Sequence, residues 1–262
     1  MSHGFARLQE MGLDGFAKKF TAAGFVTLVF DYRYWGESEG EPRNQIFALE
    51  MAEDYRNGIT WLSKRPEVDA QRIGVWGTSY SGGICLYVGI HDRRVKAVVA
   101  QVPSTLNPES RRAKDPETWD RIGEFLSHDR IERYRTESVN YMKVVAPEGE
   151  PCVFPDKAAY EWYMEFREFA PNWQNMVTLE SLEKLREFDP VSLIHLMSPT
   201  ALLLIAGEKD NLIPIEAVRD TYERARKPKE LSVLPITHFA PYKDPWLSKA
   251  AGLATDWFRE YL

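Results

Sequence analysis

Short apolar runs recur along the chain and alternate with amphipathic segments. Four runs of β-branched or aliphatic residues are clear and a fifth is weaker: Phe25–Phe30, Arg72–Trp76, Val95–Val102, Ala201–Ala206 and Leu231–Leu234. Their near-continuous hydrophobicity is typical of strands that are covered on both faces. Apolar residues at helical spacing precede the first two runs and fill the final segment. This alternation predicts an α/β fold with a mostly parallel sheet.

The alternation stops in the middle of the chain, where charged and aromatic residues dominate. Helical stripes replace the strand-like runs there, and one of them extends from Tyr160 to Phe169. We therefore expect a helical insertion that covers one part of the α/β unit. The predicted organisation is a core of residues 1–104 and 190–262, interrupted by a helical cap at 105–189.

Composition excludes several classes of protein. The 262 residues include 39 acidic and 33 basic side chains, and the resulting charge of −6 argues against nucleic-acid binding. No apolar run approaches the roughly 20 residues of a membrane-spanning helix, and the first residues do not look like a secretory signal. The two cysteines, Cys85 and Cys152, form neither a disulfide framework nor a metal cluster. We expect a cytoplasmic protein without a metal or another cofactor.

The strongest local motif is Gly77-Thr78-Ser79-Tyr80-Ser81, which lies between a strand-like run and a helical pattern. It matches a nucleophile elbow, a sharp strand-to-helix turn that exposes a serine hydroxyl. The residues two positions before and after the nucleophile must be small, and Gly77 and Ser81 both satisfy that condition. Ser79 is therefore the candidate nucleophile, with an ordinary turn serine as the alternative.

A serine hydroxyl also needs a base that accepts its proton and an acid that orients the base. Asp210 follows the run Ala201–Ala206, and His238 follows the last strand-like run. The chain order of serine, aspartate and histidine is the order in which hydrolases with this elbow carry their triad. The alternatives that we consider are Glu208 as the acid and four histidines as the base: His3, His91, His128 and His195.

Further positions could complete an acyl-binding site. The backbone N–H of Tyr80, at the start of the predicted helix, would face a developing oxyanion. Trp162, Tyr163 and Trp173 are candidates for the wall of a substrate pocket, since such pockets are largely apolar and lie at domain junctions. Aromatic stripes of this kind also form ordinary core.

Taken together, these residues resemble the α/β-hydrolase superfamily. The most similar group is the dienelactone-hydrolase-like one, which includes fungal polyketide-pathway thiohydrolases and acyl transferases. The resemblance covers nearly the whole chain and includes Phe30-Asp31-Tyr32-Arg33 and the loop that follows it. It implies that His3-Gly4-Phe5 is the oxyanion loop, with the Phe5 N–H as the second donor. It also implies acyl chemistry at Ser79, either hydrolysis of an ester, thioester or lactone or transfer to another nucleophile.

The resemblance has one departure. In this family three strands precede the His-Gly loop, whereas His3 is the third residue here. The third family strand lies in the centre of the sheet, between the strands that correspond to Phe25–Phe30 and Arg72–Trp76. Either these two runs pair directly or the sequence is a truncated form, and we favour truncation.

Three functional interpretations follow from the sequence. The first is a serine hydrolase that acts on a small-molecule acyl substrate and binds neither nucleic acid nor a membrane. The second is an acyl transferase that uses the same triad, for example in polyketide biosynthesis. The third is a non-catalytic α/β-hydrolase-like protein that binds a small molecule. The sequence does not indicate whether a carrier protein or a second copy of the chain is a partner.

Overall fold

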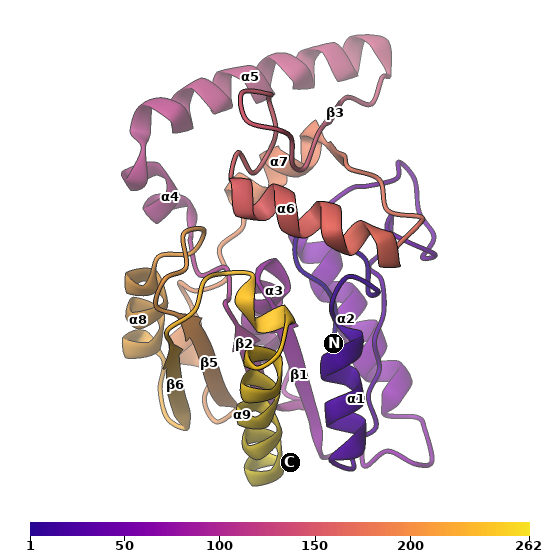
Figure 1. Ribbon diagram of the computed structural model, residues 1–262, viewed down its shortest axis with the longest axis vertical. Helices are drawn as coiled ribbons and strands as arrows, with labels where there is room; N and C mark the ends of the chain where they lie inside the picture. The colour runs from indigo at the N-terminus through magenta and orange to yellow at the C-terminus, as the bar shows by residue number, and fades with distance from the viewer.

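A parallel four-stranded sheet forms the centre of the computed structural model, which describes residues 1–262 (Figure 1). The strands lie in the order β1 (Ile73–Thr78), β2 (Val95–Gln101), β5 (Ala201–Gly207) and β6 (Lys229–Leu234). Every neighbouring pair is parallel. Four of the five predicted runs are confirmed as strands, with ends that differ from the prediction by at most two residues.

Helices cover the sheet because its central strands are apolar on both faces. All the residues of β5 are buried. In β2, every residue except Lys96 is buried. Helix α1 (Asp14–Ala22) packs with α9 (Trp246–Tyr261), and α2 (Ala48–Leu62) packs with α3 (Tyr80–His91). Helix α8 (Ile215–Arg224) contacts β5 and β6. None of the helices has both the length and the hydrophobicity that crossing a membrane requires.

Between β2 and β5 the chain forms a separate group of helices at one end of the sheet (Figure 1). The first two helices of this group each begin with a proline, and the residue before the proline caps the helix. The Asn107 side chain accepts from Ser110 N, and the Asp115 side chain accepts from Thr118 N. The elements are α4 (Pro108–Lys114), α5 (Pro116–Thr136), β3 (Tyr141–Met142), α6 (Lys157–Phe166), β4 (Val177–Thr178) and α7 (Leu179–Glu187). Short 3₁₀ turns complete the fold at Arg167–Phe169, Ile194–Leu196 and Ala240–Tyr242. The division of the chain into core and cap stays a prediction.

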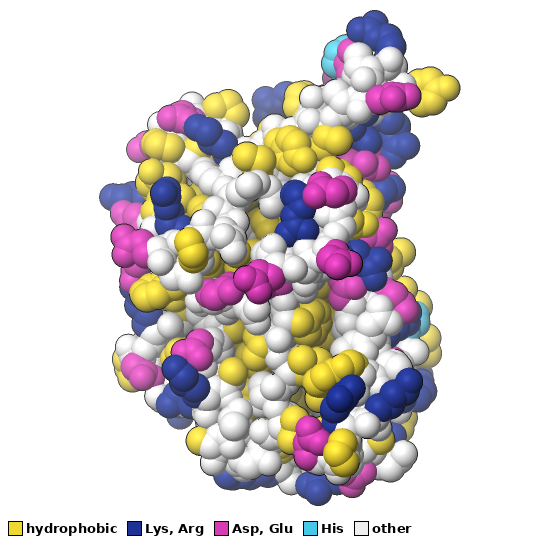
Figure 2. Space-filling view, turned by 90° about the vertical axis from the view of Figure 1, so that its right-hand side faces the viewer, with side chains coloured by type: hydrophobic (Ala, Val, Ile, Leu, Met, Phe, Trp, Pro, Cys, Tyr) yellow, Lys and Arg dark blue, Asp and Glu magenta, His cyan; other side chains and the backbone are white.

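The prediction of a strand at Phe25–Phe30 is wrong. A cleft of about 420 Å³ lies beside this segment and is lined by Val26 and Leu28 on one side and by Ile73 and Trp76 of β1 on the other. Paired strands lie about 4.8 Å apart, so a segment across a cleft has no ladder to join. Direct pairing with β1 therefore does not occur, and hydrophobic side chains lie open on this face of the molecule (Figure 2). Only the isolated bridge between Ser2 and Gly77 joins β1 on this side.

Candidate active site

Ser79 occupies the sharp turn between β1 and α3. Its φ of 57° and ψ of −122° lie in a backbone region that side-chain-bearing residues rarely adopt. Gly77 has to be small, because a Cβ at this position would overlap the backbone carbonyl of Ser81. Ser81 is buried, and its hydroxyl lies 2.6 Å from Tyr32 Oη and 2.9 Å from Tyr55 Oη. The serine that replaces the usual glycine thus anchors the elbow to two other segments.

The structure brings the three predicted triad side chains into one hydrogen-bonded chain. His238 Nε2 lies 2.9 Å from Ser79 Oγ, and His238 Nδ1 lies 2.7 Å from Asp210 Oδ2. A carboxylate accepts only, so Nδ1 donates to Asp210 and Nε2 is free to accept from the serine. The histidine and aspartate side chains are 1% and 2% exposed, whereas Ser79 is half-buried. This arrangement can remove the proton from an attacking serine hydroxyl.

Asp210 is also held by backbone donors. Its other oxygen, Oδ1, accepts from Leu212 N and Ile213 N, both at 2.9 Å. These two bonds fix the orientation of the carboxylate, so that Oδ2 points at His238. Glu208, the alternative acid, is exposed and makes no side-chain hydrogen bond in the structure.

The other histidines lie apart from this chain of hydrogen bonds. His91 lies at the end of α3 against the Tyr87 ring, with 4.4 Å between the ring centroids. His128 is exposed on α5, and His195 lies in the turn Ile194–Leu196. His3 is buried in the first loop and donates from Nδ1 to Gly4 O at 2.9 Å. Of the five histidines, only His238 forms a hydrogen bond with Ser79.

The predicted oxyanion loop lies directly beside the nucleophile. A Cβ added to Gly4 would lie 3.1 Å from Ser79 Cβ, so any larger residue here would crowd the nucleophile. The backbone N–H groups of Phe5 and Tyr80 have no acceptor within the protein. The Phe5 and Tyr80 rings also meet edge to face, with 5.6 Å between the ring centroids. Two unpaired donors next to a serine are the arrangement that an oxyanion needs.

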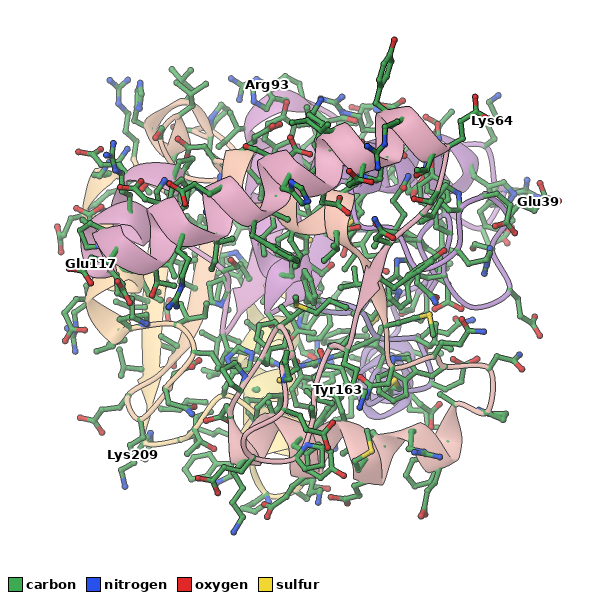
Figure 3. The ribbon with its side chains drawn as sticks, turned by 90° about the horizontal axis from the view of Figure 1, so that it is seen from above. Glu39, Lys64, Arg93, Glu117, Tyr163 and Lys209 are labelled. Atoms are coloured by element: carbon green, nitrogen blue, oxygen red, sulfur yellow. The ribbon has the colours of Figure 1, made fainter.

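Contacts from two parts of the chain hold this loop. Near the N-terminus, Asp31 Oδ1 accepts from Gln9 N at 2.8 Å. From the helical segment between β2 and β5, Tyr163 Oη donates to Phe5 O at 2.5 Å, and Trp173 Nε1 donates to Ala6 O at 2.8 Å. Figure 3 shows Tyr163 on the inner side of α6, toward the centre of the molecule. The carbonyl groups of the loop are thus tied to the helical segment above it.

These contacts place the three aromatic residues that were predicted to line a pocket. Trp162 and Tyr163 are 4% and 1% exposed, and Trp173 is partly buried. Trp162 stacks on Phe239, the neighbour of His238, with 5.5 Å between the ring centroids. Their observed role is to pack and fasten the loop, and contact with a substrate stays a prediction.

Two ionisable side chains lie in this segment: His3, which the resemblance placed in the oxyanion loop, and Arg7, which was not singled out from the sequence. His3 is fully buried, and desolvation, together with the nearby Arg7 cation, lowers its pKa to about 4, although its bond to Gly4 O opposes the shift. Burial also opposes the charge on Arg7, but the oxygens of Tyr242 and Tyr163 outweigh it and raise the pKa of this guanidinium. His3 is therefore neutral and Arg7 is charged near neutral pH. An arginine within an otherwise apolar stretch, Ala6-Arg7-Leu8, is the sequence signal that could have identified it.

The family and the fold of this chain agree with those of known proteins. The model of the X-Pro dipeptidyl-peptidase (S15) family matches residues 6–240. This chain belongs to the S15 family. Among the relatives of this S15 chain is the polyketide transferase grgF of a Penicillium species, 30% identical over 239 residues that span 89% of this chain and 78% of the relative.

Two further comparisons support the assignment. The thiohydrolase aneE of Aspergillus aculeatus is 29% identical over 239 residues, which cover 88% of this S15 chain and 74% of that one. The crystal structure of the α/β hydrolase GrgF from Penicillium superposes with a TM-score of 0.85 at 27% identity, covering 100% of this chain and 88% of the other. The expected α/β-hydrolase fold is confirmed, as is the resemblance to fungal thiohydrolases and polyketide transferases.

Proposed function

We propose that this S15-family protein is a serine acyl hydrolase that cleaves an ester, thioester or lactone through an acyl-enzyme on Ser79. One observation carries the proposal: the continuous chain from Asp210 through His238 to Ser79, which ends beside the two free N–H groups of Phe5 and Tyr80. A nucleophile, a base, an orienting acid and oxyanion donors are the complete set that acyl transfer requires.

In the first half of the reaction, Ser79 Oγ attacks the acyl carbonyl carbon and a new C–O bond forms. The hydroxyl proton passes to His238 Nε2, and the π electrons of the carbonyl move to its oxygen, which faces the Phe5 and Tyr80 N–H groups. Asp210 stabilises the imidazolium that results. The tetrahedral intermediate then collapses, the bond to the leaving group breaks, and the leaving group takes the proton from His238.

In the second half, another nucleophile attacks the acyl-enzyme with His238 as its base. Water yields hydrolysis, and an alcohol, amine or thiol yields transfer. Both outcomes use the same residues, and the names of the relatives, thiohydrolase and polyketide transferase, include both. The segment 105–189 would act as the cap that limits the access of water to the acyl-enzyme. The non-catalytic interpretation is not favoured, because these relatives are named for acyl chemistry.

The decisive experiment is active-site labelling with a fluorophosphonate, followed by location of the adduct by peptide mass. We expect one adduct on Ser79 and none in Ser79→Ala. In parallel, Ser79→Ala and His238→Ala should each lower kcat/KM for a p-nitrophenyl ester by at least about 10⁴-fold. Circular dichroism would show that both variants fold.

A matched control is His91→Ala, which removes an exposed histidine at the end of α3 and should leave the rate unchanged. Near-normal turnover by Ser79→Ala, or labelling at another residue, would refute the proposed function. Product analysis with and without an added acceptor alcohol would then separate hydrolysis from transfer.

A further inference from the structure

Arg7 is a buried cation without an acidic partner. Arg7 follows the oxyanion loop and is 2% exposed. No carboxylate oxygen lies within 4.0 Å of its guanidinium nitrogens, the limit for an ion pair. Removing an unpaired charge from water costs several kcal/mol even after the protein relaxes. A cation that is kept at such a position therefore needs a compensating interaction, and an anion beside it would provide one.

The groups around Arg7 stabilise its charge without supplying a counter-charge. The guanidinium carbon lies 4.1 Å from the ring centroid of Trp162 and 4.8 Å from that of Tyr242, within the range of cation–π attraction. Its Nε donates a long hydrogen bond of 3.4 Å to Tyr163 Oη. The buried Nη1 has no hydrogen-bond partner. All of these neighbours are neutral, so the positive charge is not cancelled.

Gly4 lies next to both Arg7 and Ser79. A Cβ on Gly4 would lie 3.4 Å from Arg7 Cζ and 3.1 Å from Ser79 Cβ. The sum of these distances, 6.5 Å, is the largest separation that Ser79 Cβ and Arg7 Cζ can have. Glycine leaves this space free of side-chain atoms. The negative charge that attack at Ser79 creates would therefore form close to the guanidinium, in a largely buried environment where screening is weak.

We propose that Arg7 is a further residue of the oxyanion site, a preorganised cation whose field stabilises the negative charge that develops at Ser79. This inference rests on the proposed function. Without Arg7, the aspartate, the imidazolium and the oxyanion of the tetrahedral intermediate carry a net charge of −1. With Arg7 the site is neutral, and the cation is already in place before the reaction begins, so no reorganisation is required.

The test compares Arg7→Met with Arg7→Lys. Methionine keeps apolar packing under Trp162 and removes the charge, whereas lysine keeps the charge. The 6.5 Å limit joins Ser79 Cβ and Arg7 Cζ; for an oxyanion at about that distance from Cζ, a Coulomb interaction at an effective dielectric constant near 20 corresponds to roughly a 100-fold effect. We expect Arg7→Met to lower kcat/KM for a p-nitrophenyl ester by about that factor, and Arg7→Lys to recover at least tenfold of the loss.

A second readout separates this role from a structural one. A phenylboronic acid forms a tetrahedral, negatively charged adduct with an active serine, so its affinity reports stabilisation of the oxyanion. The inhibition constant should weaken in Arg7→Met in parallel with kcat/KM, whereas KM for the neutral ester should change much less. If Arg7→Met does not fold, Arg7→Gln, whose amide can still donate to Tyr163, serves in its place.

The matched control is Arg186→Met. Arg186 also lies over a tryptophan, 3.8 Å from the ring centroid of Trp119, but it is on α7. Its loss should leave kcat/KM and boronate affinity unchanged. Equal losses in Arg7→Met and Arg7→Lys, or a boronate affinity that does not change, would overturn the role of Arg7. If Ser79→Ala remains active, the proposed function itself fails; if it is inactive while Arg7→Met is unaffected, only this inference fails.

Discussion

The substitution Asp210→Asn tests how strictly the triad depends on the direction of one hydrogen bond. The oxygen Oδ1 of Asp210 accepts from two backbone donors, Leu212 N and Ile213 N. An asparagine must therefore place its own carbonyl oxygen there, because the flipped amide would leave both donors unpaired at a cost of about 1–3 kcal/mol each. The NH₂ group of the asparagine then faces His238 Nδ1, in place of the Asp210 Oδ2 that lies 2.7 Å from Nδ1 in the structure.

A donor at that position forces the wrong tautomer of the base. His238 Nδ1 would have to accept, so the ring proton would move to Nε2, and Nε2 could no longer take the proton of Ser79. We expect kcat to fall by about 10³- to 10⁴-fold, with far-UV circular dichroism unchanged because asparagine has nearly the same size and keeps the two backbone bonds.

The assay is hydrolysis of a p-nitrophenyl ester at pH 7.5, with kcat calculated from the concentration of folded protein. Asp220→Asn is the matched control, since Asp220 is exposed on α8 and pairs only with Arg224. A variant Asp210→Asn that keeps its rate within tenfold would show that Asp210 does not orient the base, and Glu208 would then be the acid to test.

Two other predictions concern the oxyanion loop. Gly4→Ala would place a methyl group 3.1 Å from Ser79 Cβ, so we expect kcat/KM to fall roughly 10- to 100-fold. The control is Gly252→Ala, because a Cβ at Gly252 meets nothing within 4 Å. An unchanged rate in Gly4→Ala would contradict the close approach of Gly4 to Ser79. His3 has a folded-state pKa of about 4 against an ordinary 6.5, so the unfolded chain binds its proton first as the pH falls, and the free energy of unfolding should drop by about 3 kcal/mol between pH 6.5 and 4. Urea titrations across this range should show that component in the wild type and not in His3→Gln, and equal pH dependence of the two would contradict the burial of a neutral His3.

The hydrogen-bonded arrangement of Ser79, Asp210 and His238 could be predicted from sequence because each of these residues follows a strand of one parallel sheet. The strands β1, β5 and β6 end just before Ser79, Asp210 and the loop of His238, and carboxyl ends of parallel strands meet at one edge. The elbow adds an independent local signal, since Gly77 has to lack a side chain. Pattern and chain order together therefore determine these positions without knowledge of the packing.

The parts that were missed depend on which segments meet in space. Phe25–Phe30 has the composition of a strand, but a strand also requires a neighbour, and the cleft beside β1 removes it. The burial of Arg7 depends on aromatic rings of α6 and of the turn Ala240–Tyr242, which are far from it in the sequence. The hydrogen bond from Tyr163 to Phe5 O joins residues 158 positions apart, and nothing in either local sequence indicates that pair.

The same long-range bonds couple the helical segment to the chemistry. On the core side, the loop is linked to β1 only through the single bridge at Ser2, so a regular ladder does not hold it. Tyr163 and Trp173 donate to two successive carbonyls of that loop, and Trp162 covers Arg7. A movement of α6 would therefore displace the Phe5 N–H and the guanidinium at the same time as it admits water. The same contacts that hold α6 over the loop thus hold the Phe5 N–H and the guanidinium in place, so covering the site and positioning the oxyanion donors depend on one set of residues.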